Sequence, residues 1–310
     1  MSVTATSMHH DALLYGDDSE FTHGVAGFVR EGLRAGELPV VAEPPRQIDL
    51  LRAELGADAD SVRFLDMTQL GANPARIIAV WQALLEECAG RGVRLRGVGE
   101  PAWVGRRADE LIECRIHEQL LNVAFGEGTS WELLCPYDRR RLPASVVAGA
   151  WHSHPCVVDD DTHHNSDAYH HGDVADVFSG ALDPVPDAAD RLTFERGDVA
   201  RVRAAVRTFA RTAGLVDRRV DDVVLAADEL ATNSVRHGGG SGMIATWVRP
   251  DAVVMEFSDA GTITAPLVGR LRPGVRSNGG RGVFLANQVC DLVQIRSGPE
   301  GTRVRVTMWR

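Results

Sequence analysis

The sequence predicts two domains, and the first of them belongs to the α/β class with a mainly parallel sheet. Three observations lead to this expectation. Short apolar strands alternate with amphipathic helices through residues 1–155, a polar segment rich in His, Asp and Pro occupies 156–190, and new helix and strand patterns follow in 191–310. The chain has 310 residues, of which 44% are hydrophobic and 25% charged, which is enough to bury two cores of ordinary size.

The elements of the first domain follow one another in regular order. The run 12–15 reads as a short apolar strand. A helix is predicted over 21–36, because its apolar residues fall on one side at helical spacing: Phe21, Val25, Phe28, Val29 and Leu33. Further strands are predicted at 38–42, 62–65, 95–98 and 131–135, and further helices at 48–55, 75–89 and 108–124. Helices that separate successive strands predict parallel pairing under a helical cover.

The segment 156–190 is predicted to be a linker. It contains DDDTHHNSDAYHHGD and a stretch rich in Pro and Asp, with little apolar periodicity. Histidines cluster in and just before it, at positions 152, 154, 163, 164, 170 and 171, without a regular spacing to cysteine. A solvated, partly disordered linker is therefore favoured over a metal or pH-responsive site. The expected boundaries are 1–155, 156–190 and 191–310.

In the second domain, Glu229 and Asn233 lie one helical turn apart in the run DDVVLAADELATNSVRHGGG. Residues four apart on a helix project from one face, with Cβ atoms about 5–6 Å apart, so both side chains can reach one small ligand. Mg²⁺ favours oxygen ligands and is usually held by few protein groups and by substrate phosphates. Asn233 is therefore a candidate metal ligand, and Glu229 a candidate general base.

Three segments that contain glycine follow this helix. Asp259 ends an alternating strand pattern at 253–258, and a carboxylate beside a glycine suits an exocyclic amino group such as that of adenine. The loop 279–282, Gly-Gly-Arg-Gly, opens a helical stretch at 283–291, so backbone N–H groups can face phosphates. Arg281 adds a permanent positive charge inside that loop. Gly301 and Thr302 form the third segment.

In this order, the motifs make residues 191–310 resemble the GHKL ATPase superfamily, which includes histidine kinases, gyrase, Hsp90 and MutL. The resemblance is greatest to the serine-kinase anti-sigma factors of bacterial stress response and sporulation. It implies a two-layer α+β domain that binds ATP and Mg²⁺, with Glu229 as the catalytic residue and Asn233 as the metal ligand. The first glycine box has Ile263 where the family commonly has its last glycine. The nucleotide contacts that the resemblance implies are Asn233, His237, Asp259, Gly261, Gly279, Gly280, Arg281, Gly282 and Thr302.

Several segments of residues 9–155 resemble the MEDS sensory domain, a degenerate RecA-like module of bacterial regulators. The matching segments are HHDALLY at 9–15, FVREGLRAGE at 28–37, NPARII at 73–78, GVGEPAW at 97–103, ECRIHE at 113–118 and LCPYD at 134–138. A pocket at strand ends, where open α/β sheets usually bind ligands, could be lined by Glu100, His117, Cys135 and Asp138. Alternatively, Cys114 and Cys135 are core residues.

Composition narrows the class of protein. Residues 191–310 hold 18 Arg and 12 acidic residues, a net charge of +6, whereas residues 1–190 hold 15 Arg and 31 acidic residues, a net charge of −16. The acidic half is a poor candidate for nucleic-acid binding. The chain has no lysine, which excludes a phosphate loop that carries one. The five cysteines are scattered, as reduced thiols are. No apolar run approaches a membrane span, and the start lacks a signal-peptide pattern, so we expect a cytoplasmic protein.

The sequence thus predicts a two-domain switch in which an N-terminal sensor controls a C-terminal kinase. The resemblance implies that the kinase phosphorylates a STAS-type antagonist on Ser or Thr and alternatively binds a sigma factor. It favours a homodimer, and it implies no direct nucleic-acid or membrane partner. An ordinary histidine kinase is disfavoured, because 172–190 is rich in Pro and Asp and leaves no room for a two-helix dimerisation hairpin. A binding switch without catalysis, in which ATP only shapes a partner surface, is the alternative. A DNA-binding regulator has only the Arg-rich half in its favour.

Overall fold

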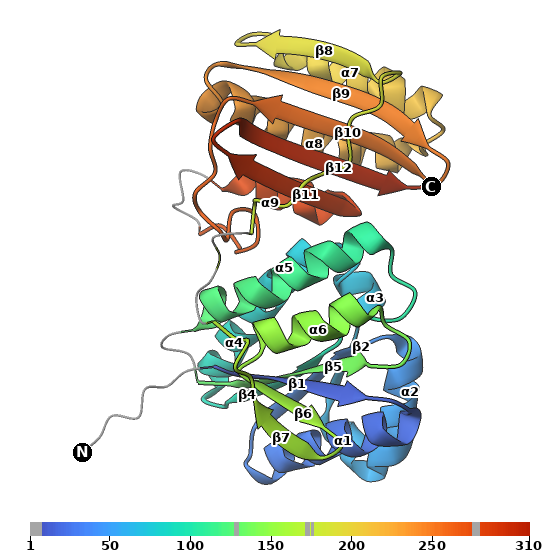
Figure 1. Cartoon of the computed structure of the whole chain (residues 1–310), viewed down its shortest axis with the longest axis vertical. Helices are drawn as coiled ribbons and strands as arrows, with labels where there is room; N and C mark the ends of the chain where they lie inside the picture. Colours follow the sequence, from blue (N-terminus) through green and yellow to red (C-terminus); the bar gives the residue numbers. More distant parts are fainter. Residues whose placement is uncertain (1–7, 127–129, 171–173, 175–176, 275–279) are drawn as a thin grey trace, which may run out of the picture. The chain divides into compact units, whose positions relative to one another are not determined.

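The computed structural model describes residues 8–126, 130–170, 174, 177–274 and 280–310. The chain divides into two compact units, Met1–Asp173 and Val174–Arg310, and each is described by itself below (Figure 1). Among the described helices, none combines the length and apolar character that crossing a bilayer requires.

Unit 1 is built on a seven-stranded sheet in the order β3-β2-β4-β5-β1-β6-β7. All neighbouring strands pair in parallel except the last two, which form an antiparallel hairpin. This confirms the predicted α/β class with a mainly parallel sheet. The strands are β1 (His9–Tyr15), β2 (Leu38–Glu43), β3 (Arg63–Asp66), β4 (Leu95–Gly99), β5 (Glu132–Asp138), β6 (Cys156–Asp159) and β7 (Thr162–Asn165).

Helices separate the first strands of unit 1, as the alternating pattern predicted. The long helix α1 begins where Asp17 accepts hydrogen bonds from the N–H groups of Ser19 and Glu20, and it buries Phe21 and Val25 against the sheet. The helices of unit 1 are α1 (Asp18–Arg34), α2 (Pro45–Leu55), α3 (Met67–Leu70), α4 (Ile77–Arg91), α5 (Ala108–Phe125) and α6 (Ala144–Ser153), with 3₁₀ turns at Gly56–Ser61 and Pro74–Arg76.

The predicted linker 156–190 needs correction at both ends. Cys156–Asn165 form β6 and β7, because Val157 is fully buried beside β1 and a tight turn joins the two strands. Asp160 and Asp161 make that turn with φ values of 46° and 57°, a conformation that Asp tolerates better than most residues.

The end of the predicted linker packs on unit 2. Phe178 lies against the core of that unit, and its carbonyl accepts the N–H of Ser297 at 3.1 Å. The carbonyl of Asp183 accepts a hydrogen bond from Arg305 at 2.6 Å. These backbone contacts give the segment a fixed place in unit 2 that its polar composition did not reveal.

Unit 2 has two layers. Its five strands are antiparallel in the order β11-β12-β10-β9-β8, and helices α7, α8 and α9 enclose an apolar core against the sheet (Figure 1). This confirms the predicted α+β fold. The elements are β8 (Asp190–Glu195), α7 (Val199–Thr212), α8 (Asp217–His237), β9 (Ser241–Arg249), β10 (Ala252–Asp259), α9 (Arg281–Val289), β11 (Leu292–Gly298) and β12 (Gly301–Trp309).

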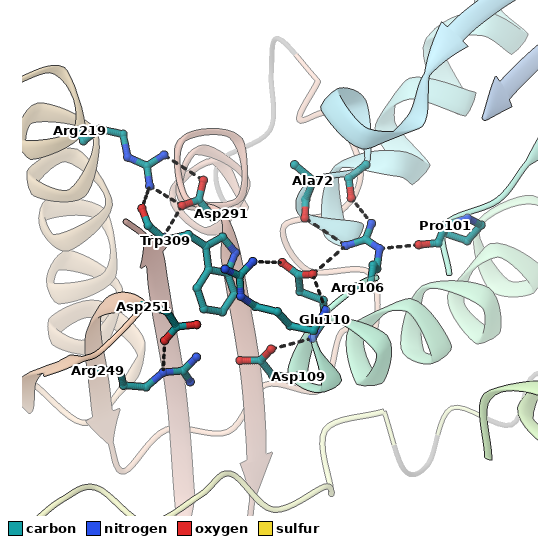
Figure 2. A network of polar contacts seen from close by, with 12 residues as sticks. Ala72, Pro101, Arg106, Asp109, Glu110, Arg219, Arg249, Asp251, Asp291 and Trp309 are labelled. Carbon is teal, nitrogen blue, oxygen red and sulfur yellow. Dashed lines mark hydrogen bonds and ion pairs between the residues drawn. The ribbon is translucent and has the colours of Figure 1, made fainter. Parts of the chain in front are cut away.

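A partly buried ion pair between Arg219 and Asp291 holds the start of α8 against the sheet (Figure 2). Arg219 donates to Asp291 at 3.0 Å and to the carbonyl of Trp309 at 3.0 Å, while Asp291 accepts the N–H of Trp309 at 2.7 Å. One carboxylate and one guanidinium thereby join α8, the start of β11 and the end of β12. These contacts hold the helix that carries Glu229 and Asn233 in a fixed position on the sheet.

In unit 1, the buried Arg106 has a comparable role for the loop after β4 (Figure 2). Its guanidinium donates to the carbonyls of Pro101, at 2.6 Å, and Ala72, at 3.3 Å, and stacks over the Trp103 ring at 3.6 Å. A guanidinium has five donors, so one side chain can satisfy several loop carbonyls at once. The loop that follows Glu100 is therefore fixed by a single residue.

Candidate nucleotide-binding site

The helix α8 positions Glu229 and Asn233 at the border of its buried face. Its apolar side packs into the core through Val223, Ala227, Leu230 and Ala231, which leaves Glu229 and Asn233 half-buried. Both side chains are thus held near the protein surface and remain accessible to a ligand.

Gly282 brings the start of α9 directly against these two residues. A Cβ atom added at Gly282 would lie 2.8 Å from Oε2 of Glu229 and 2.9 Å from Nδ2 of Asn233. These distances are shorter than any normal carbon contact, so no larger residue fits without displacing the pair. The structure therefore brings the helix motif and the second glycine loop together, as the order of the motifs predicted.

Asp259, at the end of β10, is oriented by two hydrogen bonds. Its Oδ2 accepts from the hydroxyl of Ser234 at 2.7 Å, and its Oδ1 accepts from the N–H of Gly261 at 2.9 Å. A Cβ atom at Gly238 would lie 2.6 Å from Oδ1 of Asp259, so a glycine is needed there as well. The carboxylate is fixed between the end of α8 and the first glycine box.

Thr302 ties the final strand to that box. Its hydroxyl donates to the carbonyl of Gly261 at 2.9 Å and lies 2.7 Å from the hydroxyl of Ser297. Ile263, which stands in place of a glycine, is half-buried, packs against the core, and donates its N–H to Ser297 Oγ at 2.8 Å. The side chain at 263 therefore points to the core and contributes packing.

The remaining predicted residues lie around this centre. Gly280 precedes α9 with φ +84°, which permits the turn into the helix, and Arg281 is exposed at the first helical position, with Nη2 3.5 Å from the carbonyl of Gly274. His237 is the exposed last residue of α8, and its carbonyl lies 2.5 Å from a Cβ atom built at Gly261. The predicted contact at Gly279 lies outside the described residues.

Two residues of this site were missed from the sequence. Ser234 and Gly238 both contact Asp259, one through a hydroxyl and one through close backbone approach. A serine on the buried face of an apolar helix was a usable signal, because a buried hydroxyl needs a partner. Nothing in the local pattern indicated that the partner would be Asp259, which lies 25 residues later at the end of β10.

The geometry combines a carboxylate and a carboxamide on α8 with the N-terminal end of α9. The first N–H groups of a helix are unpaired, and the helix dipole is positive there, so that end favours anions such as phosphate. Oε2 of Glu229 and the carboxamide of Asn233 lie beside it, and an oxygen atom from each would favour a divalent cation. The absence of a Cβ atom at Gly261 and Gly282 lets the neighbouring segments approach each other closely. A polyphosphate with its metal ion fits this set of groups.

The residues considered for a pocket at the strand ends of unit 1 do not all lie together. Glu100 lies just after β4, where Tyr15 donates to it at 2.9 Å, and Asp138 ends β5 and accepts the N–H groups of Arg140 and Arg141. Cys135 lies elsewhere on β5, where its sulfur is 3.3 Å from His10. His117 is buried on α5, and Cys114 is a core residue whose thiol donates to the carbonyl of Pro101 at 3.2 Å.

Burial governs the protonation of the acids near that strand end. Loss of solvation raises the pKa of Glu100 to about 7, and it raises the pKa of the neighbouring Glu43 well above its ordinary value, with the Glu100 charge adding to the effect. Glu43 is fully buried on β2. The pair is therefore at least partly protonated near neutral pH.

Comparisons with known proteins agree with the two units. The MEDS family (MEthanogen/methylotroph, DcmR Sensory domain) matches residues 9–155, and the histidine kinase-like ATPase domain family matches residues 192–308. A crystal structure of the RsbU and RsbW domains of Rv1364c from Mycobacterium tuberculosis is similar at 21% sequence identity and a TM-score of 0.30. That match covers 40% of this chain and 34% of the other, so this chain spans about a third of its length. No curated protein matches significantly.

Proposed function

From a chain that joins a MEDS domain to a histidine kinase-like ATPase domain, we propose a cytoplasmic regulator whose C-terminal unit binds Mg·ATP and phosphorylates a protein substrate. The substrate we propose is a STAS-type antagonist, modified on Ser or Thr, and the alternative partner is a sigma factor. The MEDS domain would adjust this activity in response to a signal.

The single observation that carries the proposal is the contact of Gly282 with Glu229 and Asn233. It puts an acid and an amide at the N-terminal end of α9, where a phosphate chain is favoured. In an ordinary surface helix, Glu and Asn would face water, with no glycine required against them.

Each residue has a defined part in this proposal. Asp259, held by Ser234 and Gly261, would accept a hydrogen bond from the adenine amino group. Asn233 would hold Mg²⁺ through its amide oxygen. Bound ATP would supply the transferable phosphoryl group. Glu229 would take the proton from the attacking Ser or Thr hydroxyl.

Two observations favour a protein kinase over its alternatives. The described residues between Val174 and α7 include β8 and no α-helix that could carry a phospho-accepting histidine, which disfavours a histidine kinase. A carboxylate at 229 beside the metal ligand has a use in proton transfer, whereas a switch without catalysis needs only the binding groups. The acceptor hydroxyl is therefore expected on a separate protein.

The proposal is tested by replacing Glu229 with glutamine, which keeps the shape and removes the base. The purified variant and wild type are incubated with labelled ATP and a candidate antagonist protein. Transfer should fall on the order of 10²–10⁴-fold in Glu229→Gln, because a general base contributes that much. ATP affinity, measured by calorimetry, should change little.

The control is Asp228→Asn, which removes the neighbouring carboxylate. Asp228 is paired with Arg203 at 2.6 Å on the outer side of α8, so this variant should transfer phosphate at the wild-type rate. Wild-type rates in Glu229→Gln would remove the base role. Binding of ATP without transfer to any candidate antagonist by the wild type would favour the binding-only switch.

A further inference from the structure

Four metal-ligating side chains converge in the interior of unit 1, away from the sheet edge discussed above. They are His10 on β1, Glu118 on α5, Cys135 on β5 and His154 just after α6, and each is at most 2% exposed. One ligand atom from each lies within 4.8 Å of the other three. Segments from both ends of unit 1 therefore meet at one buried point.

The distances around this point are those of a small coordination sphere. Oε2 of Glu118 lies 3.1 Å from Nε2 of His10, 3.5 Å from Nε2 of His154 and 3.6 Å from the sulfur of Cys135. Bonds of about 2.0–2.3 Å to a tetrahedral Zn²⁺ separate its ligand atoms by roughly 3.3–3.8 Å. The four side chains need only small adjustments to surround one ion.

The outer hydrogen bonds set the tautomer of both imidazoles. Nδ1 of His154 lies 2.8 Å from the carbonyl of Ala150, and a carbonyl can only accept, so this nitrogen carries the proton. Nδ1 of His10 lies 3.1 Å from Oδ1 of Asn122, whose amide nitrogen donates to the carbonyl of Ser153 at 2.8 Å. In their neutral forms both imidazoles therefore turn an Nε2 lone pair toward the centre, the arrangement that metal-binding histidines require.

The four side chains of this centre carry fewer hydrogen-bond donors than acceptors. With both imidazoles neutral, two imidazole lone pairs and a carboxylate meet, and the thiol is the only donor among the four side chains, with the Tyr137 hydroxyl as a neighbouring donor to Glu118. Nε2 of His154 and Oε1 of Glu118 are buried without a hydrogen-bond partner. Buried acceptors that face one another are costly, and a cation removes that cost.

We propose that His10, Glu118, Cys135 and His154 bind one Zn²⁺ ion. Mixed nitrogen, oxygen and sulfur ligands in fourfold arrangement suit Zn²⁺ better than Mg²⁺ or Ca²⁺, which take oxygen ligands. Binding releases the Cys135 proton to water, and the thiolate and the carboxylate together balance the two positive charges. Four protein ligands make the site structural, and it joins β1, β5, α5 and the end of α6. Glu118 also lines a cavity of about 370 Å³ between α5 and α6, which offers the ion a route.

The test is the metal content of the full-length wild-type protein, purified without chelator and incubated with Zn²⁺. Elemental analysis after gel filtration should give one Zn²⁺ per chain. Loading with Co²⁺ instead should give a thiolate-to-cobalt charge-transfer band and the intense visible bands of tetrahedral Co²⁺. Folded wild-type protein that binds no Zn²⁺, or that binds Co²⁺ without the thiolate band, overturns the proposal.

Matched cysteine variants locate the ion. Cys135→Ser should lose the charge-transfer band and bind Zn²⁺ at least ten-fold more weakly. Cys156→Ser should keep both, although Cys156 also lies near a histidine, 3.6 Å from Nδ1 of His163. Asn122→Ala should weaken Zn²⁺ binding about 10–100-fold while the thiolate band persists, because Asn122 acts through His10. Wild-type metal binding by Cys135→Ser would contradict the site. If that variant fails to fold, the wild-type cobalt spectrum still decides the matter.

Discussion

At the scale of single residues, hydrogen bonds from Ser234 and Gly261 hold the carboxylate of Asp259 in a fixed orientation, and we propose that it contacts the nucleotide. Replacement by asparagine turns one acceptor oxygen into a donor while the size stays the same. A hydrogen bond that involves a charged group contributes about 1.5–3 kcal/mol, so we expect Asp259→Asn to bind ATP about 10–100-fold more weakly. Isothermal titration calorimetry measures this directly.

The control for Asp259→Asn is Asp251→Asn at the opposite end of β10. Asp251 is exposed and lies 3.5 Å from Nε of Arg249, in the turn between β9 and β10. Its variant should bind ATP as the wild type does. Equal affinity in the wild type and in folded Asp259→Asn would show that this carboxylate does not contact the nucleotide.

Glu100 leads to a second prediction at the residue scale, that the stability of unit 1 falls as pH rises. Its folded-state pKa of about 7 is raised above the ordinary value of 4.5, mainly by burial. Protonated Glu100 avoids the cost of burying a charge. Its contribution to the free energy of unfolding of unit 1 is therefore fully present below about pH 4.5 and is lost as pH rises through about 7. Chemical denaturation of the wild type should show this loss as a smaller free energy of unfolding for unit 1, on the order of 3 kcal/mol.

The variant Glu100→Gln isolates this contribution from other titrating groups. It cannot ionise, and it also removes the charge that helps raise the pKa of Glu43. Its free energy of unfolding should fall less between pH 5 and pH 8 than that of the wild type. A wild-type slope in the variant would mean that Glu100 is ionised throughout this range.

The residues proposed for the nucleotide site were predicted from the sequence, because the order of their motifs along the chain is informative. Consecutive motifs contain Glu229, Asn233, Asp259 and Gly282. The fold places Gly282 directly against Glu229 and Asn233 on α8. The cluster around Cys135 was not found, because His10 and His154 lie at opposite ends of unit 1. Only the pairing of β1 with β5 and β6 makes them neighbours.

At the scale of elements, the packing of α9 on α8 depends on Gly282. A methyl group there would overlap the side chains of Glu229 and Asn233. The methyl group would push the ends of these two side chains away from the start of α9, so Gly282→Ala should bind Mg·ATP about 10-fold more weakly, a loss of about 1.4 kcal/mol in binding free energy. The measurement is again a calorimetric titration.

Gly298→Ala is the matched control, because a Cβ atom at Gly298 meets nothing within 4 Å. It should leave ATP affinity and thermal stability close to those of the wild type. If Gly282→Ala bound Mg·ATP as tightly as Gly298→Ala, the close contact of α9 with α8 would have no role in nucleotide binding.

Local periodicity predicted the elements of unit 1 up to β5, apart from the short helix α3 (Met67–Leu70), and it missed the apolar helix α6 (Ala144–Ser153) that follows. The predicted strand at 131–135 and helix at 108–124 correspond closely to β5 and α5. The sequence did not predict strands β6 and β7, because their exposed residues are His and Asp and their run of apolar residues is short. Here pairing with β1 outweighs the low strand preference of the local sequence.

At the scale of the whole molecule, the sequence predicted two domains joined by a linker at 156–190, whereas the two compact units divide between residues 173 and 174. The structure ends unit 1 at Asp173, and it gives the residues around Phe178 and Asp183 to unit 2 through backbone hydrogen bonds. Such contacts use carbonyl groups, which every residue carries, so composition does not reveal them. A fragment that begins at residue 191 lacks these contacts, whereas one that begins at residue 174 keeps them.

The central claim is that unit 2 contains a complete Mg·ATP site, and titration of Mg·ATP into the fragment 174–310 tests it most directly. All residues assigned to the nucleotide lie in that unit. We predict that the fragment unfolds cooperatively on heating and binds one Mg·ATP, as the full-length chain does. A folded fragment and a folded full-length chain that both fail to bind Mg·ATP would contradict the account.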